Sequence, residues 1–295
     1  MESSKQRSFS ECNFLIVGTV RNCEKTIINE VNRLNDIFKK ANKASWLIVE
    51  SDSVDGTKES LKNLKLKLPY FDFISLGRLA DNYPERARRI AFCRDVYVKE
   101  IRSRLEYSDV NYVVVADLDG MCSDLTYKSV LTCWAKSNWT ACFANQPKGY
   151  YDLWALRHDY WNPRDPFITF KKLHNLGINA AKAYKTAVID KILKIDIAST
   201  WVPVRSAFGG LGIYKYEAFI KSDYSVKGEY PDKTCEHVTF NKKLGKSISD
   251  CNLYINPSLV NINRSGHVFQ LKLKYFLLKF FGYSLFKKLK HFKLK

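Results

Sequence analysis

The sequence has little of what would anchor the chain in a membrane, cross-link it or divide it. No run of about 18 apolar residues could span a bilayer, and the N-terminal segment MESSKQRSFSECN lacks the apolar core of a signal peptide. The eight cysteines include no CxxC pair, which indicates neither a zinc site nor a disulfide framework. No linker rich in proline, glycine or serine and no internal repeat is found. These absences predict a cytoplasmic protein with reduced thiols and one large domain, with at most a small appendage.

The hydrophobic content supports a sizeable core, and the chain carries a large positive net charge. Of the 295 residues, 46% are hydrophobic, which is enough for one large core. Lysine and arginine number 48 against 30 acidic residues, so the formal net charge is +18. A field of this sign attracts anions of any kind, so the charge calls for an anionic partner or another explanation.

Three short apolar runs, each followed by polar residues, predict buried strands that end in turns: residues 13–18, 46–50 and 112–116. Apolar residues at helical spacing follow the first run, and a Lys/Leu-rich helical stretch begins at Lys58 after the second. Alternating strand, turn and helix is typical of an α/β protein with a parallel sheet and helices on its faces. Ligands of such sheets bind beyond the carboxyl ends of the strands, so the three polar turns are predicted to share one binding edge.

The segment YVVVADLDG, residues 112–120, ends in two aspartates one residue apart. Side chains alternate in an extended chain, so Asp117 and Asp119 can point the same way and share a hard cation that holds a diphosphate. A plain turn after a buried strand explains the same residues, because Asp and Gly are common turn formers. The expected co-location of three polar turns favours the metal hypothesis.

At these residues the chain resembles the metal-dependent glycosyltransferases of the GT-A fold, with their DxD motif at residues 117–119. The same likeness includes an ESDSxDGT-like element, ESDSVDGT at 50–57. A narrower likeness, to the capsule-associated α-1,3-mannosyltransferase family of fungi, rests on ordered blocks: RARRIAFCRD at 86–95, YYDLWALR at 150–157, FGGLG at 208–212 and CEHV at 235–238. The resemblance implies a mixed sheet flanked by helices over residues 13–267. A flexible N-terminus, residues 1–12, and a basic amphipathic helical tail, residues 268–295, lie outside it.

The resemblance also implies a reaction, the transfer of a hexose from a nucleotide-diphosphate sugar to a glycan or lipid-linked acceptor. GDP-mannose is the favoured donor, a UDP-sugar remains open, and the cofactor is Mn²⁺ or Mg²⁺. Sugar specificity changes easily on one fold, so donor and linkage do not follow from the fold.

Donor contacts are expected where the polar turns meet the first turn of the arginine-rich helical stretch at 85–104. The expected donor-binding residues are Thr19, Arg21, Glu50, Asp52, Arg86, Arg89 and Asp117. Guanidinium groups match phosphate geometry. The alternative is that the arginines, beside Glu85 and Asp95, form a solvated, ion-paired face.

A third metal ligand is expected near the end of the similar region. Asp117 and Asp119 supply carboxylates, and His267, in a glycine-flanked loop, is the predicted imidazole ligand, which would favour Mn²⁺ over Mg²⁺. His237 is the rival candidate, and a purely structural hydrogen-bonding role is the alternative for either histidine.

Two carboxylates are candidates for the catalytic groups. Glu236 is the natural general base if the reaction inverts the configuration of the anomeric carbon. If the reaction retains that configuration and gives an α-linked product, as the fungal resemblance implies, Glu236 orients the acceptor or supports the leaving sugar. Asp152 lies in a segment of acidic, basic and aromatic residues suited to a sugar. The expected acceptor or sugar contacts are Arg157, Gly209, Gly210 and His237, because glycine lets backbone amides approach a ligand closely.

The C-terminal segment is basic and amphipathic. From residue 271 to residue 295 there are eight lysines and no acid, and Leu273, Phe276, Leu277, Phe280 and Phe281 share a helical face. This pattern predicts peripheral contact with an anionic membrane surface. The alternative is a terminal helix docked on the protein's own core, and nucleic acid is the less favoured partner.

Two other classes of function compete with the glycosyltransferase. A nucleotidyltransferase acting on sugar phosphates also uses paired carboxylates and metals, but it has no need of the YYDLWALR and CEHV blocks. A non-catalytic basic protein that binds nucleic acid or membrane would bind in a salt-sensitive way and be indifferent to Mn²⁺.

Overall fold

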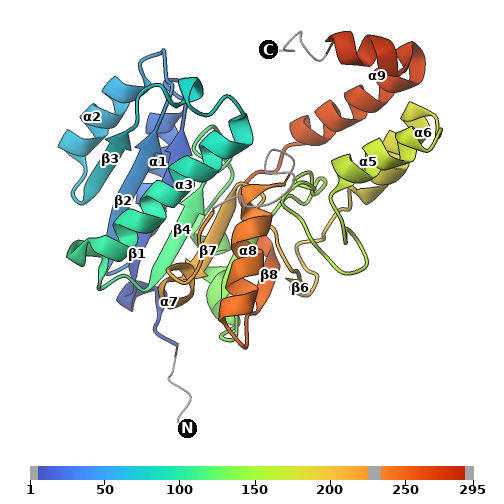
Figure 1. The fold of residues 1–295 in the computed structure, drawn as a ribbon. Helices are drawn as coiled ribbons and strands as arrows, with labels where there is room; N and C mark the ends of the chain where they lie inside the picture. The colour runs from blue at the N-terminus through green and yellow to red at the C-terminus, as the bar shows by residue number, and fades with distance from the viewer. Residues whose placement is uncertain (1–5, 225–233, 290–295) are drawn as a thin grey trace.

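The computed structural model describes residues 6–224 and 234–289, and this part of the chain is built around one sheet of eight strands (Figure 1). The strands are β1 (Asn13–Val20), β2 (Lys43–Glu50), β3 (Phe71–Ser75), β4 (Tyr112–Ala116), β5 (Ala141–Asn145), β6 (Val202–Pro203), β7 (Leu211–Lys215) and β8 (Leu253–Val260). The α-helices are α1 (Ile27–Phe38), α2 (Thr57–Lys67), α3 (Arg86–Ser103), α4 (Tyr127–Leu131), α5 (Pro166–Asn175), α6 (Ala180–Ala187), α7 (Tyr216–Phe219), α8 (Glu236–Ser247) and α9 (Gly266–Leu289). Short 3-10 helices are η1 (Phe9–Glu11), η2 (Leu79–Asp81), η3 (Leu105–Tyr107), η4 (Thr132–Ala135) and η5 (Ile189–Lys191).

The sheet is mixed. Its strand order is β3-β2-β1-β4-β7-β5-β8-β6, and the first four strands in that order run parallel. β7 is antiparallel to both β4 and β5, β8 runs parallel to β5, and β6 is antiparallel to β8. The prediction of an α/β protein with a mixed sheet flanked by helices is confirmed, and each of the three predicted strands is present.

Successive residues of the parallel strands enter two different cores, one on each face of the sheet. In β1, Leu15 and Val17 pack into the core under α3 and α8, whereas Phe14 and Ile16 pack into the core under α1 and α2. β2 and β4 alternate in the same way. Because both faces are covered, these strands have no polar side, which is why the sequence shows continuous apolar runs.

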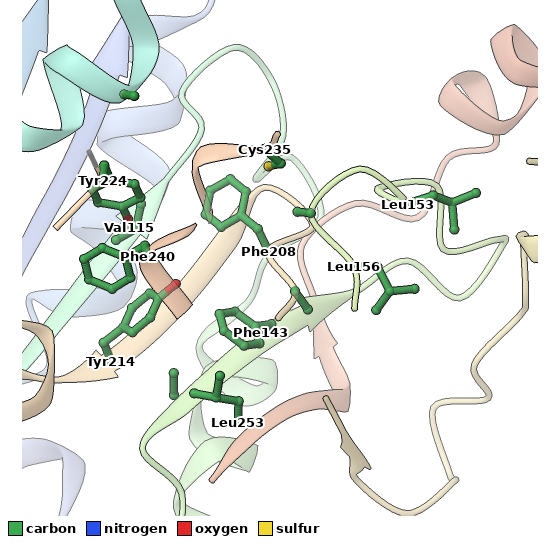
Figure 2. Packing of buried hydrophobic residues seen from close by; sticks show 14 of the residues in the cluster. Val115, Phe143, Leu153, Leu156, Phe208, Tyr214, Tyr224, Cys235, Phe240 and Leu253 are labelled. Atoms are coloured by element: carbon green, nitrogen blue, oxygen red, sulfur yellow. The ribbon is translucent and has the colours of Figure 1, made fainter. Parts of the chain in front are cut away.

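Aromatic rings fill the core beneath α8. Figure 2 shows the rings of Tyr214, Tyr224 and Phe240 gathered together, with Phe143 nearby. The centroid of the Phe240 ring lies 4.3 Å from that of Tyr224 and 5.6 Å from that of Tyr214. Because Phe240 belongs to α8, this packing holds the helix against the sheet and so fixes the position of Glu236 at its start.

The packed chain begins earlier than the sequence predicted. Phe9 is buried, and its ring centroid lies 4.9 Å from that of Phe14 and 5.9 Å from that of Phe38. Cys12 is fully buried as well. The expectation of a flexible segment through residue 12 is therefore corrected for residues 6–12, because Phe9 completes an aromatic cluster on the sheet.

The C-terminal helix is also part of the packed structure. α9 lies against α6, Val268 and Leu278 are buried, and the helix is interrupted at Gly282, where φ is 70° and ψ is 175°. The docked alternative therefore holds for one face of α9. The face expected to be apolar is a different one, and on it Phe276 and Phe280 are 49% and 69% exposed.

Residues 290–295 of the expected tail lie outside the described part of the chain. Among the described residues, none of the helices combines the length and apolarity needed to cross a bilayer.

Candidate functional site

The carboxyl ends of β1, β2 and β4 meet at one edge of the sheet, and hydrogen bonds connect the turns that follow β1 and β2. The Ser51 amide donates to the Val20 carbonyl at 3.3 Å, and the Asn22 amide donates to the Ser53 hydroxyl at 3.1 Å. A cavity of about 550 Å³ opens at this edge. Its walls also include the start of α3, residues 151–155 and the start of α8.

Most of the predicted site residues line this one cavity: Thr19, Arg21, Asp52, Arg86, Arg89, Asp117, Asp119, Asp152, Glu236 and His237. The remaining predicted residues, Glu50, Arg157, Gly209, Gly210 and His267, do not line it. The parallel topology explains Thr19, Arg21, Asp52, Asp117 and Asp119, because every turn after a parallel strand opens on the same edge.

The two aspartates of the DxD segment have different surroundings. Leu118 between them is buried, so the alternation of an extended chain sends both carboxyls toward the cavity. Asp117 is fixed: its amide donates to the Gly210 carbonyl at 2.9 Å, and its carboxyl lies 3.2 Å from the Arg94 guanidinium. Asp119 is exposed, and its carboxyl has no hydrogen bond or ion pair with another residue that the structure describes.

Negative charge is in excess around Asp117. Burial raises the pKa of Asp117 to about 7, Arg94 opposes the rise, and the neighbouring carboxylates of Asp119, Asp152 and Glu236 add to it. Asp117 therefore lies near three other carboxyl groups and one buried guanidinium. Such a surplus favours a bound cation or a bound proton.

The donor chemistry at this edge fits a hard divalent cation, because carboxylate oxygens are the ligands that Mg²⁺ and Mn²⁺ prefer. Within the described residues, no group of three or more His, Cys, Asp or Glu side chains is arranged to hold a metal ion. Asp117 and Asp119 would thus be the two protein ligands of such a cation.

The third expected ligand, His267, is not assembled with the two aspartates. Its ring stacks on that of Tyr151, with the centroids 4.4 Å apart, and Tyr151 rather than His267 lines the cavity. Burial lowers the pKa of His267, and the charge of Asp119 opposes that shift. His267 therefore lies within electrostatic range of Asp119, behind a tyrosine ring.

Arg94 is a cavity-lining residue that the sequence analysis did not name as a site candidate. It is buried on α3. Its Nε lies 3.3 Å from the Glu236 carboxyl, and its Nη2 lies 3.2 Å from the Asp117 carboxyl. Its guanidinium also lies over the rings of Phe208 and Tyr224, 5.1 and 5.6 Å from their centroids. A signal was available, because Arg94 falls at helical spacing among the buried residues Ala87, Ala91, Val98 and Ile101.

The other arginines of α3 differ from one another. Arg86 is exposed and makes no hydrogen bond or ion pair to another described residue. Arg88 lies 3.7 Å from Glu85 on the surface, which matches the expected ion-paired face. Arg89 donates to the carbonyls of residues 83 and 84, each at 2.7 Å, and lies 3.6 Å from Asp52. Arg86 is therefore the arginine of this turn that is free to meet a ligand.

Glu236 and His237 form a buried pair at the start of α8. Glu236 is 5% exposed and His237 is 2% exposed, and 3.7 Å separates the His237 Nε2 from the Glu236 carboxyl. The His237 ring stacks on Phe208 at a centroid distance of 3.8 Å. Burial, together with the charge of Arg94, lowers the pKa of His237 well below its ordinary value, so the ring is neutral at pH 7.

Neither ring nitrogen of His237 has a hydrogen-bond partner among the described residues. Because buried polar groups are almost always paired, two unpaired nitrogens in a cavity wall indicate that a ligand or water completes this wall.

Asp152 is held by backbone amides. Its carboxyl accepts a hydrogen bond from the Gly209 amide at 2.9 Å and another from the Ala155 amide at 3.3 Å. Burial raises the pKa of Asp152. The carboxyl therefore has a fixed orientation on the cavity wall.

The glycines at 209 and 210 have an internal role instead of the expected ligand contact. Their φ angles are +69° and +90°, in the region that favours glycine. The Gly209 amide is used by Asp152, and the Gly210 carbonyl accepts from the Asp117 amide. The turn thus connects the Asp152 carboxyl to the backbone of the DxD segment, and neither glycine lines the cavity.

Glu50 and Arg157 are corrected in the same way. Glu50 is fully buried and accepts hydrogen bonds from the Ser53 amide at 3.0 Å and the Ser75 hydroxyl at 2.5 Å, so it closes the turn after β2. Arg157 pairs with Asp165 at 3.2 Å and donates to the carbonyls of residues 154 and 156. Both residues support the walls of the site from outside it.

The raised pKa of Asp117 leads to a stability prediction. Its folded-state pKa, about 7, exceeds the ordinary value of 3.8, so the folded state holds its proton more tightly and loses stability as pH rises from about 4 to about 7. Asp117→Asn is therefore expected to raise the melting temperature at pH 8, without divalent cations, by about 2 to 4 °C, and not to raise it at pH 4. The effect is modest because the side chain is 35% exposed and solvent screens part of the charge.

Melting curves of wild type and Asp117→Asn in a chelator, from pH 4 to pH 8, measure this difference. Asp250→Asn, at an exposed position away from the cavity, is the matched control and is expected to leave the curves unchanged. A melting-temperature difference between wild type and Asp117→Asn that is the same at every pH contradicts the prediction.

Comparison with known proteins gives distant structural likeness only. No family model matches the chain, and no curated protein matches its sequence. Among solved structures, the chain is similar to residues 1–349 of TarS from S. aureus, with 13% identity and a TM-score of 0.48 over 90% of this chain and 65% of that one. It is also similar to the mannosyltransferase PcManGT from Pyrobaculum calidifontis, solved with GDP-Man and Mn²⁺, with 11% identity and a TM-score of 0.49 over 90% of this chain and 62% of that one. The chain thus spans less than two thirds of the length of either protein, and likeness at this level assigns no activity.

Proposed function

We propose that the protein is a GT-A glycosyltransferase that transfers a hexose, with mannose favoured, from a nucleotide-diphosphate sugar to a glycan or glycolipid acceptor, using Mn²⁺ or Mg²⁺. One observation carries the proposal: an anchored and an uncommitted aspartate, Asp117 and Asp119, lie together at the carboxyl edge of the parallel strands, in a cavity that arginines also line. The resemblance of the sequence blocks around this cavity supports the same reaction class and favours GDP-mannose over a UDP-sugar.

The cavity offers both signs of charge that a metal-bound diphosphate requires. Carboxylates from Asp117 and Asp119 would hold the cation, which when bound supplies Lewis-acid stabilisation of the leaving diphosphate, worth several kcal/mol. Arg86, with no partner among the described residues, is placed to bind a phosphate oxygen, and the exposed Arg21 lies on the wall formed by the β1 turn. Thr19 and Asp52, which line the same walls, are the proposed contacts of the nucleotide.

The opposite walls suit the sugar and the acceptor. Asp152, oriented by two amides, retains lone pairs for a sugar hydroxyl, and Tyr151 and Trp154 beside it offer aromatic faces. Glu236 serves as the base for the acceptor hydroxyl if the reaction inverts. If the reaction retains, Glu236 orients the acceptor, and in either case Arg94, whose Nε lies 3.3 Å from the Glu236 carboxyl, fixes the position of that carboxyl.

The test is thermal stabilisation of the purified protein by GDP, UDP, CDP and ADP, each with and without Mn²⁺. One diphosphate is expected to raise the melting temperature by about 5 °C or more at 100 times its dissociation constant, only with metal present. Asp119→Asn should abolish this rise, whereas the surface control Asp250→Asn should keep it.

Turnover then identifies the donor, with GDP-mannose and UDP-GlcNAc, the ligands of PcManGT and TarS, as the first candidates. Metal-dependent release of the diphosphate from a sugar nucleotide supports the proposal. Absence of metal-dependent stabilisation by every nucleotide overturns it, and turnover of a sugar 1-phosphate instead would identify a nucleotidyltransferase.

A further inference from the structure

The outward face of α9 carries an exposed aromatic stripe. Phe269, Phe276 and Phe280 are 64%, 49% and 69% exposed and recur at helical spacing on one side of the helix. The rings of Phe276 and Phe280 lie parallel, 6.2 Å apart at their centroids with an interplanar angle of 6°. Val268 and Leu278 on the opposite side are buried, so α9 docks by one face and presents a second apolar face to its surroundings.

The three helices of this region carry charge of one sign, although Asp190 of η5, which contacts α9, pairs with Lys185 at 2.6 Å. Neither α9 nor the helices α5 and α6 beside it contain any aspartate or glutamate. These helices contribute exposed lysines to the same region of the fold: Lys171, Lys172, Lys182, Lys185, Lys272 and Lys279. Figure 1 shows the three helices together on one side of the protein, away from β1, β2 and β3.

Two of these lysines border the stripe itself. Lys272 and Lys279 lie one helical row from Phe269, Phe276 and Phe280, and the Lys279 ammonium is 5.7 Å from the centre of the Phe280 ring. Leu176, in the turn between α5 and α6, is 79% exposed and adds apolar surface nearby. Aromatic rings flanked by lysines match the boundary between headgroups and acyl chains, where rings insert and ammonium groups reach the phosphates.

We propose that this outward face of α9, defined by Phe269, Phe276, Phe280, Lys272 and Lys279, binds the surface of an anionic membrane. A second copy of the chain fits less well, because a symmetric contact would bring like-charged lysines together. Nucleic acid would satisfy the lysines but would leave the phenylalanine rings in water. An anionic bilayer satisfies both kinds of side chain at once.

The outward face of α9 lies close to the cavity. His267 stacks on Tyr151, which lines the cavity, and Phe269 follows only two residues later in α9. The stripe therefore begins beside the cavity wall, and a bound bilayer would lie next to the site. Membrane binding itself does not depend on the proposed reaction, so the two proposals can fail separately.

Flotation of the full chain with lipid vesicles tests the proposal. Wild type is expected to bind vesicles of phosphatidylcholine with phosphatidylglycerol and to bind pure phosphatidylcholine far more weakly. Phe276→Ala/Phe280→Ala should weaken binding to the anionic vesicles at least about tenfold, because two inserted rings are lost. Lys272→Ala/Lys279→Ala should weaken it by a similar factor and reduce its sensitivity to salt.

Matched controls remove exposed apolar side chains and exposed lysines at and beside α2 and β3, away from α9. Leu66→Ala/Tyr70→Ala removes side chains that are 85% and 65% exposed, and Lys58→Ala/Lys67→Ala removes two exposed lysines of α2. Both controls should bind like wild type. Failure of wild type to bind anionic vesicles overturns the proposal, as does an equal loss in the controls. A dimer in sedimentation velocity that Phe276→Ala/Phe280→Ala abolishes, with no vesicle binding, would show that the face contacts a second copy and would also overturn it.

Discussion

Arg94→Met is expected to lower the free energy of unfolding by about 3 to 5 kcal/mol and to abolish metal-dependent nucleotide binding. Arg94 is 3% exposed and is the buried cation between Glu236, at 3.3 Å, and Asp117, at 3.2 Å. Methionine fills a similar volume but leaves two carboxylates without their counter-charge. Breaking a buried ion pair from one side is costly for this reason, whereas the pair itself contributes little net stability. Denaturant unfolding measures the first effect and thermal shift with nucleotide and Mn²⁺ the second.

The matched control and a double variant separate charge from packing. Arg88→Met, on the exposed side of the same helix, should change the free energy of unfolding by less than about 0.5 kcal/mol. Adding Glu236→Gln to Arg94→Met removes one of the two uncompensated charges. The free energy of unfolding lost in the double variant should therefore be smaller, by about 1 kcal/mol or more, than the sum of the two single losses. Additive losses would mean that Arg94 acts through packing on Phe208 and Tyr224 and not through Glu236.

The parallel half of the sheet and the edge that holds the site were predictable because their signals are local. Buried strands such as residues 112–116 appear as continuous apolar runs, and each is followed at once by its polar turn. Alternation with helices then implies parallel strands, and parallel strands place all their turns on one edge. This reasoning brings Thr19, Asp52 and Asp117 to one cavity without knowledge of any contact between them.

The residues that were misplaced depend on partners far along the chain. Arg157 has the chemistry of a sugar ligand, but its position is decided by Asp165 and by carbonyls that only the folded loop presents. Gly209 resembles a ligand-binding turn until Asp152 takes its amide. Composition cannot indicate which partner a buried polar group has, since several partners of the same type are available.

α9 shows a second limit of periodicity. Apolar residues occur on more than one side of this helix, and the pattern identifies the side with Phe276 and Phe280 as the apolar face. In the structure, a different side containing Val268 and Leu278 packs on the protein. The side that docks lies against α6 and η5, and contacts with elements so far along the chain are not visible in the periodicity of α9.

Gly209→Ala is expected to cost about 3 to 5 kcal/mol of folding free energy and to weaken metal-dependent nucleotide binding at least about tenfold. A β-carbon at this position would lie 2.5 Å from the Gln146 side-chain nitrogen and 3.0 Å from the Ala144 carbonyl oxygen. The Gln146 amide would have to move, although it donates to the Gly209 carbonyl at 2.6 Å and to Asn261 at 3.1 Å. Overpacking, a lost buried hydrogen bond and a φ of +69° each contribute.

Gly177→Ala is the matched control, because Gly177 has a φ of +86° but no atom within 4 Å of the position its β-carbon would take. Gly177→Ala should lose only the free energy of the backbone strain, about 1 to 2 kcal/mol of folding stability, and should leave nucleotide binding unchanged. The difference between the two variants therefore measures what the turn at 209 and 210 contributes beyond its unusual backbone. Since the Gly209 amide orients Asp152 and the Gly210 carbonyl holds the Asp117 amide, a shift of this turn moves two cavity carboxyls together. Equal losses of stability and unchanged nucleotide binding in both variants would mean that the turn tolerates the extra carbon and does not position the DxD segment.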